Sequence, residues 1–271
     1  MNFLQRARSV ERFVGLMLTL CALGCNDDTG SGLVQFAAYA AGPEAAVAGQ
    51  PYAFDNAFGY HVVLDRAQLT IGALYLNRSR PTLGAQDTPC ILPGVYAAEV
   101  TSKLVIDALS NRPNEFPTLG HGTADRALAG EVWLTGERVD ATRDTTHILE
   151  YSGTASRQNL IYGFSGVITI DKNRALGSND LATPGANPLC KQRIVTPIPI
   201  DITPSQGGQL TLRVRPEKWF EYVDFATLPG ALGQGELLQI PDVPDGQAAV
   251  ALFQGIRGVN AYQFSWIGGA P

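Results

Sequence analysis

Two of the three histidines in this sequence lie four residues before an aspartate, a spacing that could support chemistry. His61 and Asp65 fall in a predicted strand, where alternate side chains point the same way, so both would lie on one face of a sheet. His121 and Asp125 lie in the glycine-containing loop sequence LGHGTADR. An imidazole near a carboxylate can bind a metal ion or take part in acid–base catalysis.

An ordinary alternative fits both pairs, namely a solvent-exposed histidine near a hydrated carboxylate. The sequence contains neither HxH nor HExxH, and the third histidine, His147, follows two threonines without any metal-binding pattern. We therefore predict no catalytic residue and no cofactor. A metal ion held by residues of the two pairs is a hypothesis that no motif supports.

One serine lies in a partial hydrolase motif. The sequence GFSG, Gly163–Gly166, begins like GxSxG, but Val167 occupies the place of the closing glycine. The motif also falls inside a predicted strand, whereas a nucleophilic serine of this type needs a turn between a strand and a helix. We expect a β-bulge or kink at this position.

The amino terminus combines a basic start with a short apolar run. Arg6, Arg8 and Arg12 precede or border the run Phe13–Gly24, which has 12 residues and no charge. A helix needs about 20 apolar residues to cross a bilayer core, so this run is too short to span one. A basic start, a short apolar middle and a small residue before the cleavage point are typical of an export signal.

The last four residues of this region, Ala22-Leu23-Gly24-Cys25, resemble the lipobox of bacterial lipoprotein precursors. The resemblance implies cleavage before Cys25, attachment of diacylglycerol to its thiol, and acylation of the freed amine by a fatty acid such as palmitate. Ala22 departs from the leucine that the family prefers. The alternative is an ordinary secretory signal with an incidental cysteine.

This resemblance implies a domain organisation. Residues 1–24 would be the signal peptide, residues 25–32 the lipidated cysteine with a flexible tether, and residues 33–271 a single β-rich globular domain. Several acyl chains anchor a protein stably where one binds marginally. The protein would then be exported and lipid-anchored to the bacterial cell envelope, in the inner or the outer membrane, with its domain in the periplasm or at the cell surface.

Two cysteines remain in the predicted mature domain. Cys21 leaves with the signal peptide and Cys25 is modified, which leaves Cys90 and Cys190. An oxidising compartment favours their pairing in a structural disulfide. Two separate buried thiols are the alternative.

The charge of the mature chain argues against one class of partner. Removing residues 1–24 takes away three arginines and Glu11, which changes the formal net charge from −5 to −7. Nucleic-acid binding is driven largely by neutralisation of phosphates, so an acidic chain without a basic patch is not expected to bind nucleic acid.

Alternating apolar residues and frequent turn residues predict many short strands. The longest extended run, Tyr60–Leu76, changes its apolar face partway, which predicts a bulge or break near Arg66–Ala67 and a second weak point at Gly72. Further strands are predicted over Leu33–Ala40, Lys103–Leu109, Ala129–Gly136, Thr145–Tyr151, Asn159–Asp171 and Ala261–Ile267.

A hairpin is predicted from Ile198–Thr203 and Gln209–Arg215, joined by the turn sequence PSQGG. Pro197 and Pro199 lack amide hydrogens, so the first of these strands should lie at a sheet edge. Helical spacing of apolar residues predicts two short helices, over Glu217–Leu228 and Gln247–Gly258.

The fold class that follows is all-β, a mainly antiparallel β-sandwich with one or two short helices, preceded by a cleaved signal peptide. The strand order and turn rhythm loosely resemble envelope lipoprotein domains of unknown role, and no functional residue carries over. Trp133, Trp219 and Trp266 have the spacing of core residues, although exposed tryptophans would favour stacking on a sugar or a partner.

These observations favour a lipid-anchored cell-envelope lipoprotein with a non-enzymatic binding or structural role. It would contact the membrane through its anchor and could bind an envelope protein or a glycan. A periplasmic metal-handling lipoprotein that uses histidine and carboxylate ligands is the alternative, and an envelope hydrolase is the least favoured reading.

Overall fold

Alternation of apolar and polar residues gives the strands of this protein one buried face. The computed structural model describes residues 32–80, 95–136, 146–170, 192–231, 237–243 and 245–269. The chain divides into residues 1–32 and a body, Leu33–Pro271. In strand β1 (Leu33–Ala41), Val34 and Phe36 are buried while Leu33 and Gln35 are exposed, as the period of a half-buried strand requires.

The larger sheet of the body has nine strands. Its main path runs in the order β12 (Ile194–Ile202), β9 (Ala127–Trp133), β4 (Ala73–Asn77), β5 (Tyr96–Val100), β8 (Gly120–Thr123), β1, β13 (Gln209–Val214) and β15 (Tyr262–Ile267), and β7 (Asn114–Glu115) pairs with β1. The pairs are antiparallel except for β1 with β13, which is parallel. The two end strands, β12 and β15, contact each other, so this sheet nearly closes on itself.

The second sheet has six strands and carries the pocket described below. Its order is β14 (Leu237–Gln239), β11 (Leu160–Ile168), β10 (Leu149–Arg157), β3 (His61–Ile71) and β2 (Tyr52–Asp55), and β6 (Leu104–Asp107) pairs with β3. Every pair in this sheet is antiparallel except β11 with the short edge strand β14.

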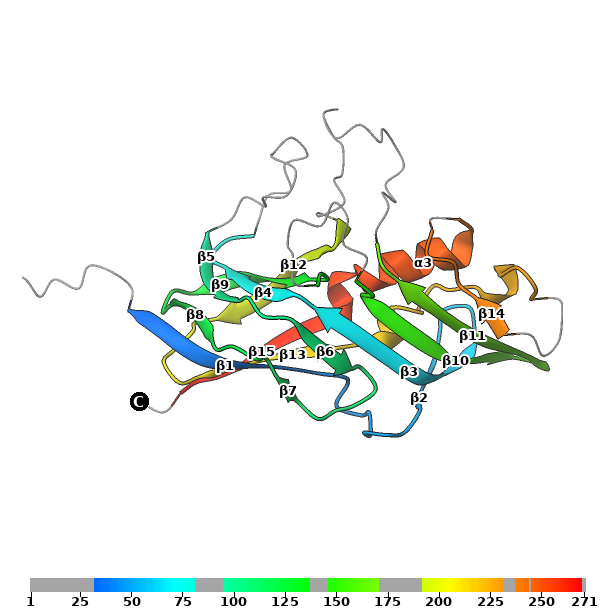
Figure 1. Cartoon of the computed structure of the whole chain (residues 1–271), viewed down its shortest axis with the longest axis horizontal. Coiled ribbons are helices and arrows are strands. Elements are labelled where there is room, and N and C mark those ends of the chain that lie inside the picture. Colours follow the sequence, from blue (N-terminus) through cyan, green and yellow to red (C-terminus); the bar gives the residue numbers. More distant parts are fainter. Residues whose placement is uncertain are drawn as a thin grey trace, which may run out of the picture. The chain divides into compact units, whose positions relative to one another are not determined.

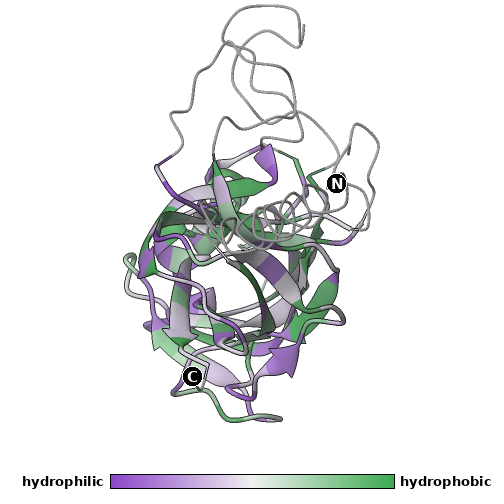
Figure 2. Ribbon diagram, turned by 90° about the vertical axis from the view of Figure 1, so that its left-hand side faces the viewer, coloured by the Kyte–Doolittle hydropathy of each residue, from purple (hydrophilic) through white to green (hydrophobic). Residues whose placement is uncertain are grey.

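One large apolar core joins the two sheets and the helix α3 (Gln247–Ile256). Phe164 of β11 packs against Phe220 and Phe225, with ring centroids 5.4 and 4.7 Å apart. The short 3-10 helices η1 (Pro216–Lys218), η2 (Phe225–Thr227) and η3 (Val259–Ala261) complete the described elements. The fold is the predicted β-rich sandwich (Figure 1), and in the view turned by 90° its strands form a nearly closed ring (Figure 2). No helix in the described ranges has the length and apolarity needed to cross a membrane.

The predicted weak points of the long extended run are confirmed. The pairing of β3 with β10 shifts so that Asp65 has no partner between Leu64 and Arg66, which places a bulge one residue before the predicted position. At Gly72 the chain leaves the six-stranded sheet and continues as β4 of the nine-stranded sheet. A Cβ atom at Gly72 would collide with Thr135, so a glycine is needed at this crossing.

The predicted hairpin between the strands on either side of PSQGG is wrong. Strand β12 pairs with β9, whereas β13 pairs with β1 and β15. The turn residues PSQGG are present, but each strand is buried against other partners in a different part of the sheet. This packing outweighs the preference of the turn sequence for a hairpin. The expected edge position of β12, with Pro197 and Pro199, is confirmed.

The predicted helix over Glu217–Leu228 is also wrong, because this segment forms η1 and η2 with turns between them. The side chain of Asn56 donates to the carbonyl oxygens of Phe220 and Val223, at 3.2 and 2.8 Å. These carbonyls would accept hydrogen bonds from later amides in a continuous α-helix, so Asn56 replaces those bonds. The other predicted helix is confirmed as α3.

The three tryptophans do not form an exposed stacking surface, since two are buried and Trp266 is half-buried against the main core. Trp219 is fully buried, and Trp266 packs edge-on against Phe36 with ring centroids 5.1 Å apart. Trp133 lies in a small second cluster with Tyr75, on the opposite face of the nine-stranded sheet from the main core.

Candidate functional site

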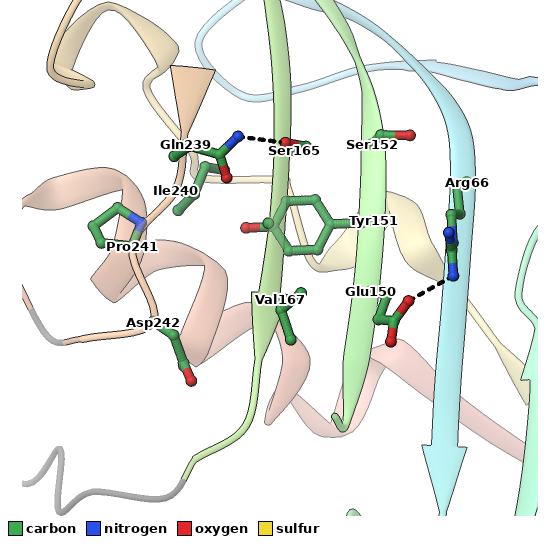
Figure 3. A pocket seen from close by; sticks show the side chains of 11 residues that line it. Arg66, Glu150, Tyr151, Ser152, Ser165, Val167, Gln239, Ile240, Pro241 and Asp242 are labelled. Carbon is green, nitrogen blue, oxygen red and sulfur yellow. Dashed lines mark hydrogen bonds and ion pairs between the residues drawn. The ribbon is translucent and has the colours of Figure 1, made fainter. Parts of the chain in front are cut away.

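A pocket of about 470 Å³ lies on the outer face of the six-stranded sheet. We call it the sheet-face pocket. It is formed by Arg66, Glu150, Tyr151, Ser152, Ser165, Gly166, Val167, Gln239, Ile240, Pro241 and Asp242 (Figure 3). These residues come from β3, β10, β11, β14 and the segment after β14, so the pocket depends on strands that are distant in sequence.

The floor of the pocket consists of small side chains. Ser152 of β10 lies directly between Arg66 of β3 and Ser165 of β11 in the strand register. Two residues farther along, at the next position whose side chains face outward, Glu150 lies opposite Val167. Small residues flanked by longer side chains on the neighbouring strands leave a hollow in the sheet surface.

One wall is formed where β14 separates from β11. The Ile240 amide donates to the Ser165 carbonyl at 3.2 Å, and Pro241 then supplies no amide to continue the ladder. Asp242 reattaches the chain, because its Oδ2 accepts hydrogen bonds from the backbone amide and the hydroxyl of Thr169. The pocket opens between these two attachment points.

Gly166 allows Tyr151 to lie beside this opening. A Cβ atom on Gly166 would collide with the phenol group of Tyr151 and would lie 3.1 Å from the Ile240 carbonyl oxygen. The Tyr151 side chain is buried, and its ring packs against Phe220 with centroids 5.4 Å apart. Figure 3 shows the ring pointing across β11 toward Ile240 and Pro241.

The opposite wall is a chain of paired polar groups. Arg66 donates from Nη2 to Glu150 at 2.5 Å and to Gln68 at 2.8 Å. The second carboxylate oxygen of Glu150 lies 2.7 Å from Nδ1 of His147. The Arg66 and Glu150 side chains are 52% and 32% exposed, so water screens this pair and it orients side chains more than it stabilises the fold.

The chemistry of this pocket favours recognition by hydrogen bonds. Ser165 accepts a hydrogen bond from the amide of Gln239 at 2.7 Å, so its hydroxyl is held by an amide and not by a histidine base. Ser165 belongs to the partial motif GFSG, and the expected bulge or kink there is wrong, since β11 pairs with β10 without a register shift from Leu160 to Ile168.

The first predicted metal pair is not formed. His61 is exposed at the start of β3, and its Nδ1 lies 2.9 Å from Oδ1 of Asp55 on the neighbouring strand β2. Asp65 is exposed at the bulge farther along β3. The structure thus pairs His61 with Asp55 and not with the predicted Asp65.

His121 and Asp125, the second predicted pair, do not contact each other either, because Asp125 has other partners. His121 is exposed on β8, opposite Gln35 and Glu99. Asp125 instead binds the guanidinium of Arg78 and the hydroxyl of Thr123.

His61 and His121 belong to different sheets. Within the described ranges, no group of three or more histidine, cysteine, aspartate or glutamate side chains could hold a metal ion.

The three cysteines with predicted roles lie outside the described residues. These are Cys25, predicted to be lipidated, and Cys90 and Cys190, predicted to form a disulfide. The lipidation and the disulfide therefore stay predictions.

A buried carboxylate lies on the other sheet. Glu131 is fully buried on β9 and accepts hydrogen bonds from Asn77 at 2.8 Å and from Trp133 at 3.1 Å. Burial raises the pKa of this carboxyl, and the hydrogen bonds from Trp133 and Asn77 oppose that rise. The network joins β4 and β9, so we assign it a structural role.

Comparison with known proteins gives no relative from which a function could be transferred. No family model, no curated protein and no solved structure matches this chain. The function must therefore be argued from the residues themselves.

Proposed function

We propose that this chain is a lipid-anchored cell-envelope protein whose β-sandwich body has a non-enzymatic binding role. The lipobox-like sequence that ends at Cys25 supports the anchor. The first strand begins at Leu33, eight residues after Cys25, so a short tether would lead directly into the body. That arrangement would hold the body close to a membrane surface.

The observation that carries the binding role is the sheet-face pocket. Its polar side chains are held in place before any ligand arrives, Arg66 by Glu150 and Gln239 by Ser165. Side chains that are already ordered lose little conformational entropy on binding, which favours affinity. The metal-handling alternative has weaker support, because His61 and His121 would have to act separately.

Palmitate labelling tests the anchor. Cells that express the full chain are labelled with radioactive palmitate and then separated into membrane and soluble fractions. We expect label in the wild-type protein and in Cys21→Ser, but no label in Cys25→Ser, which should also leave the membrane fraction. Cys21→Ser is the matched control, since it removes a thiol from the same apolar segment. Label that persists in Cys25→Ser would refute the proposal.

A further inference from the structure

The hydrogen-bonding groups of the sheet-face pocket are mixed. Ser152 and Ser165 carry hydroxyls that both donate and accept, and Gln239 carries an amide with both functions, whereas the Asp242 carboxylate already accepts from Thr169. A complementary ligand must therefore both donate and accept at several closely spaced atoms. Hydroxyl groups do both.

The charges that line the pocket disfavour an anionic ligand. The ionisable lining groups are one guanidinium, Arg66, and two carboxylates, Glu150 and Asp242. Arg66 already donates to Glu150, so an incoming anion would meet two carboxylates and a cation that has a partner. Glu150 likewise lies within reach of both Arg66 and His147, which reduces its attraction for an added cation.

The shape and apolar part of the pocket suit a small ring. Val167 and Pro241, both half-buried, provide apolar surface next to the polar groups. The volume of about 470 Å³ falls in the range of about 300–1,000 Å³ that is usual for small-ligand sites. A pyranose has an apolar face of C–H groups and a rim of hydroxyls, which matches this combination.

We infer that the sheet-face pocket binds an uncharged sugar unit, one or two rings in size, as part of a glycan. This inference rests on the proposed binding function and names the class of ligand. Hydrogen bonds with Gln239, Ser152 and Ser165 would hold the hydroxyls, while Pro241 and Val167 would contact the ring face.

Saturation-transfer NMR with two matched pyranoses tests the inference. The full-length protein, in a detergent without a sugar headgroup, is mixed with glucose or glucuronate. We expect transfer to glucose, and binding of glucuronate that is weaker by about tenfold or more, which corresponds to about 1.4 kcal/mol. The disaccharide maltose should bind at least as well as glucose. No transfer to either neutral sugar, or equal binding of glucuronate, would overturn the inference.

A pair of serine substitutions locates the site. Ser152→Phe fills the centre of the pocket floor, whereas Ser156→Phe makes the same change on the same face of β10, four residues and about 13 Å away. We expect Ser152→Phe to abolish transfer and Ser156→Phe to keep it, with both variants folded by circular dichroism. Transfer kept in Ser152→Phe, or lost in both folded variants, would refute this site. Palmitate labelling does not depend on the pocket, so failure here would leave the anchor proposal intact.

Discussion

Two glycines of β11 illustrate how single residues shape the candidate site. A Cβ atom added at Gly166 would collide with the Tyr151 phenol, whereas one added at Gly163 would meet only the Leu237 side chain, at 3.6 Å. Glycine inside a strand normally costs stability relative to alanine. A glycine at position 166 lowers the stability of the strand, but it is needed because Tyr151 occupies the space of a Cβ atom. Position 163 has no such requirement.

This difference gives a prediction for two alanine variants. Gly166→Ala should lower the free energy of unfolding by about 1–3 kcal/mol, because Tyr151 or β14 must move to relieve the collision. Gly163→Ala should leave the free energy of unfolding unchanged or raise it by up to about 1 kcal/mol. Urea denaturation followed by circular dichroism measures both. Equal effects of the two substitutions would contradict the close packing of Tyr151 over Gly166.

The residues of the sheet-face pocket could not be predicted from the sequence alone. Arg66, Glu150 and Asp242 are distant in sequence, and the β10–β3 bulge at Asp65 sets which side chains of β3 face the pocket. Ser165 lay in a motif that the sequence analysis considered for catalysis, but nothing near it in sequence indicated its partner Gln239. Pairing of strands that are distant in sequence created the site.

At the scale of elements, local sequence patterns predicted most strands but did not predict which strands pair with each other. The strands β1, β9, β10, β11 and β15 and the helix α3 overlap their predicted ranges, because period-two and period-3.6 patterns record which face is buried. The predicted hairpin failed, because the turn residues between β12 and β13 do not determine the partners of either strand. The predicted helix after Pro216 failed because Asn56, far away in sequence, binds the carbonyls that the helix would have used.

The predicted disulfide rests on the sequence alone. Cys90 and Cys190 lie outside the described residues, and export to an oxidising compartment is the reason to expect their pairing.

We therefore predict that Cys90 and Cys190 are joined in the mature protein. Without a reductant, iodoacetamide should modify neither cysteine in the denatured protein. Reduction alone should raise the intact mass by two hydrogens, and iodoacetamide should then modify both thiols. Reduction should also lower the free energy of unfolding, by up to about 4.7 kcal/mol for a loop of 100 residues. Full modification of both cysteines without a reductant would rule the pairing out.

At the scale of the whole body, the two sheets share one core. Leu64 of β3 and Leu74 of β4 belong to the same buried cluster, although their strands lie in different sheets, and Leu252 of α3 belongs to it as well. The chain passes directly from one sheet to the other at Gly72. Loss of either sheet would expose the inner face of the other, so neither should remain folded alone.

This shared core predicts a single cooperative unfolding transition, which the tryptophans can test from both sides of the nine-stranded sheet. Trp219 reports on the main core and Trp133 on the second cluster. In the wild-type protein, and in Trp133→Phe and Trp219→Phe, fluorescence and far-ultraviolet circular dichroism should give the same urea midpoint within each protein. The two variants should have lower midpoints than the wild type, because each loses buried ring contacts. A fluorescence midpoint that differs from the circular dichroism midpoint in Trp219→Phe, where Trp133 and Trp266 remain, would show that part of the body unfolds separately, and that the shared core does not govern the whole body.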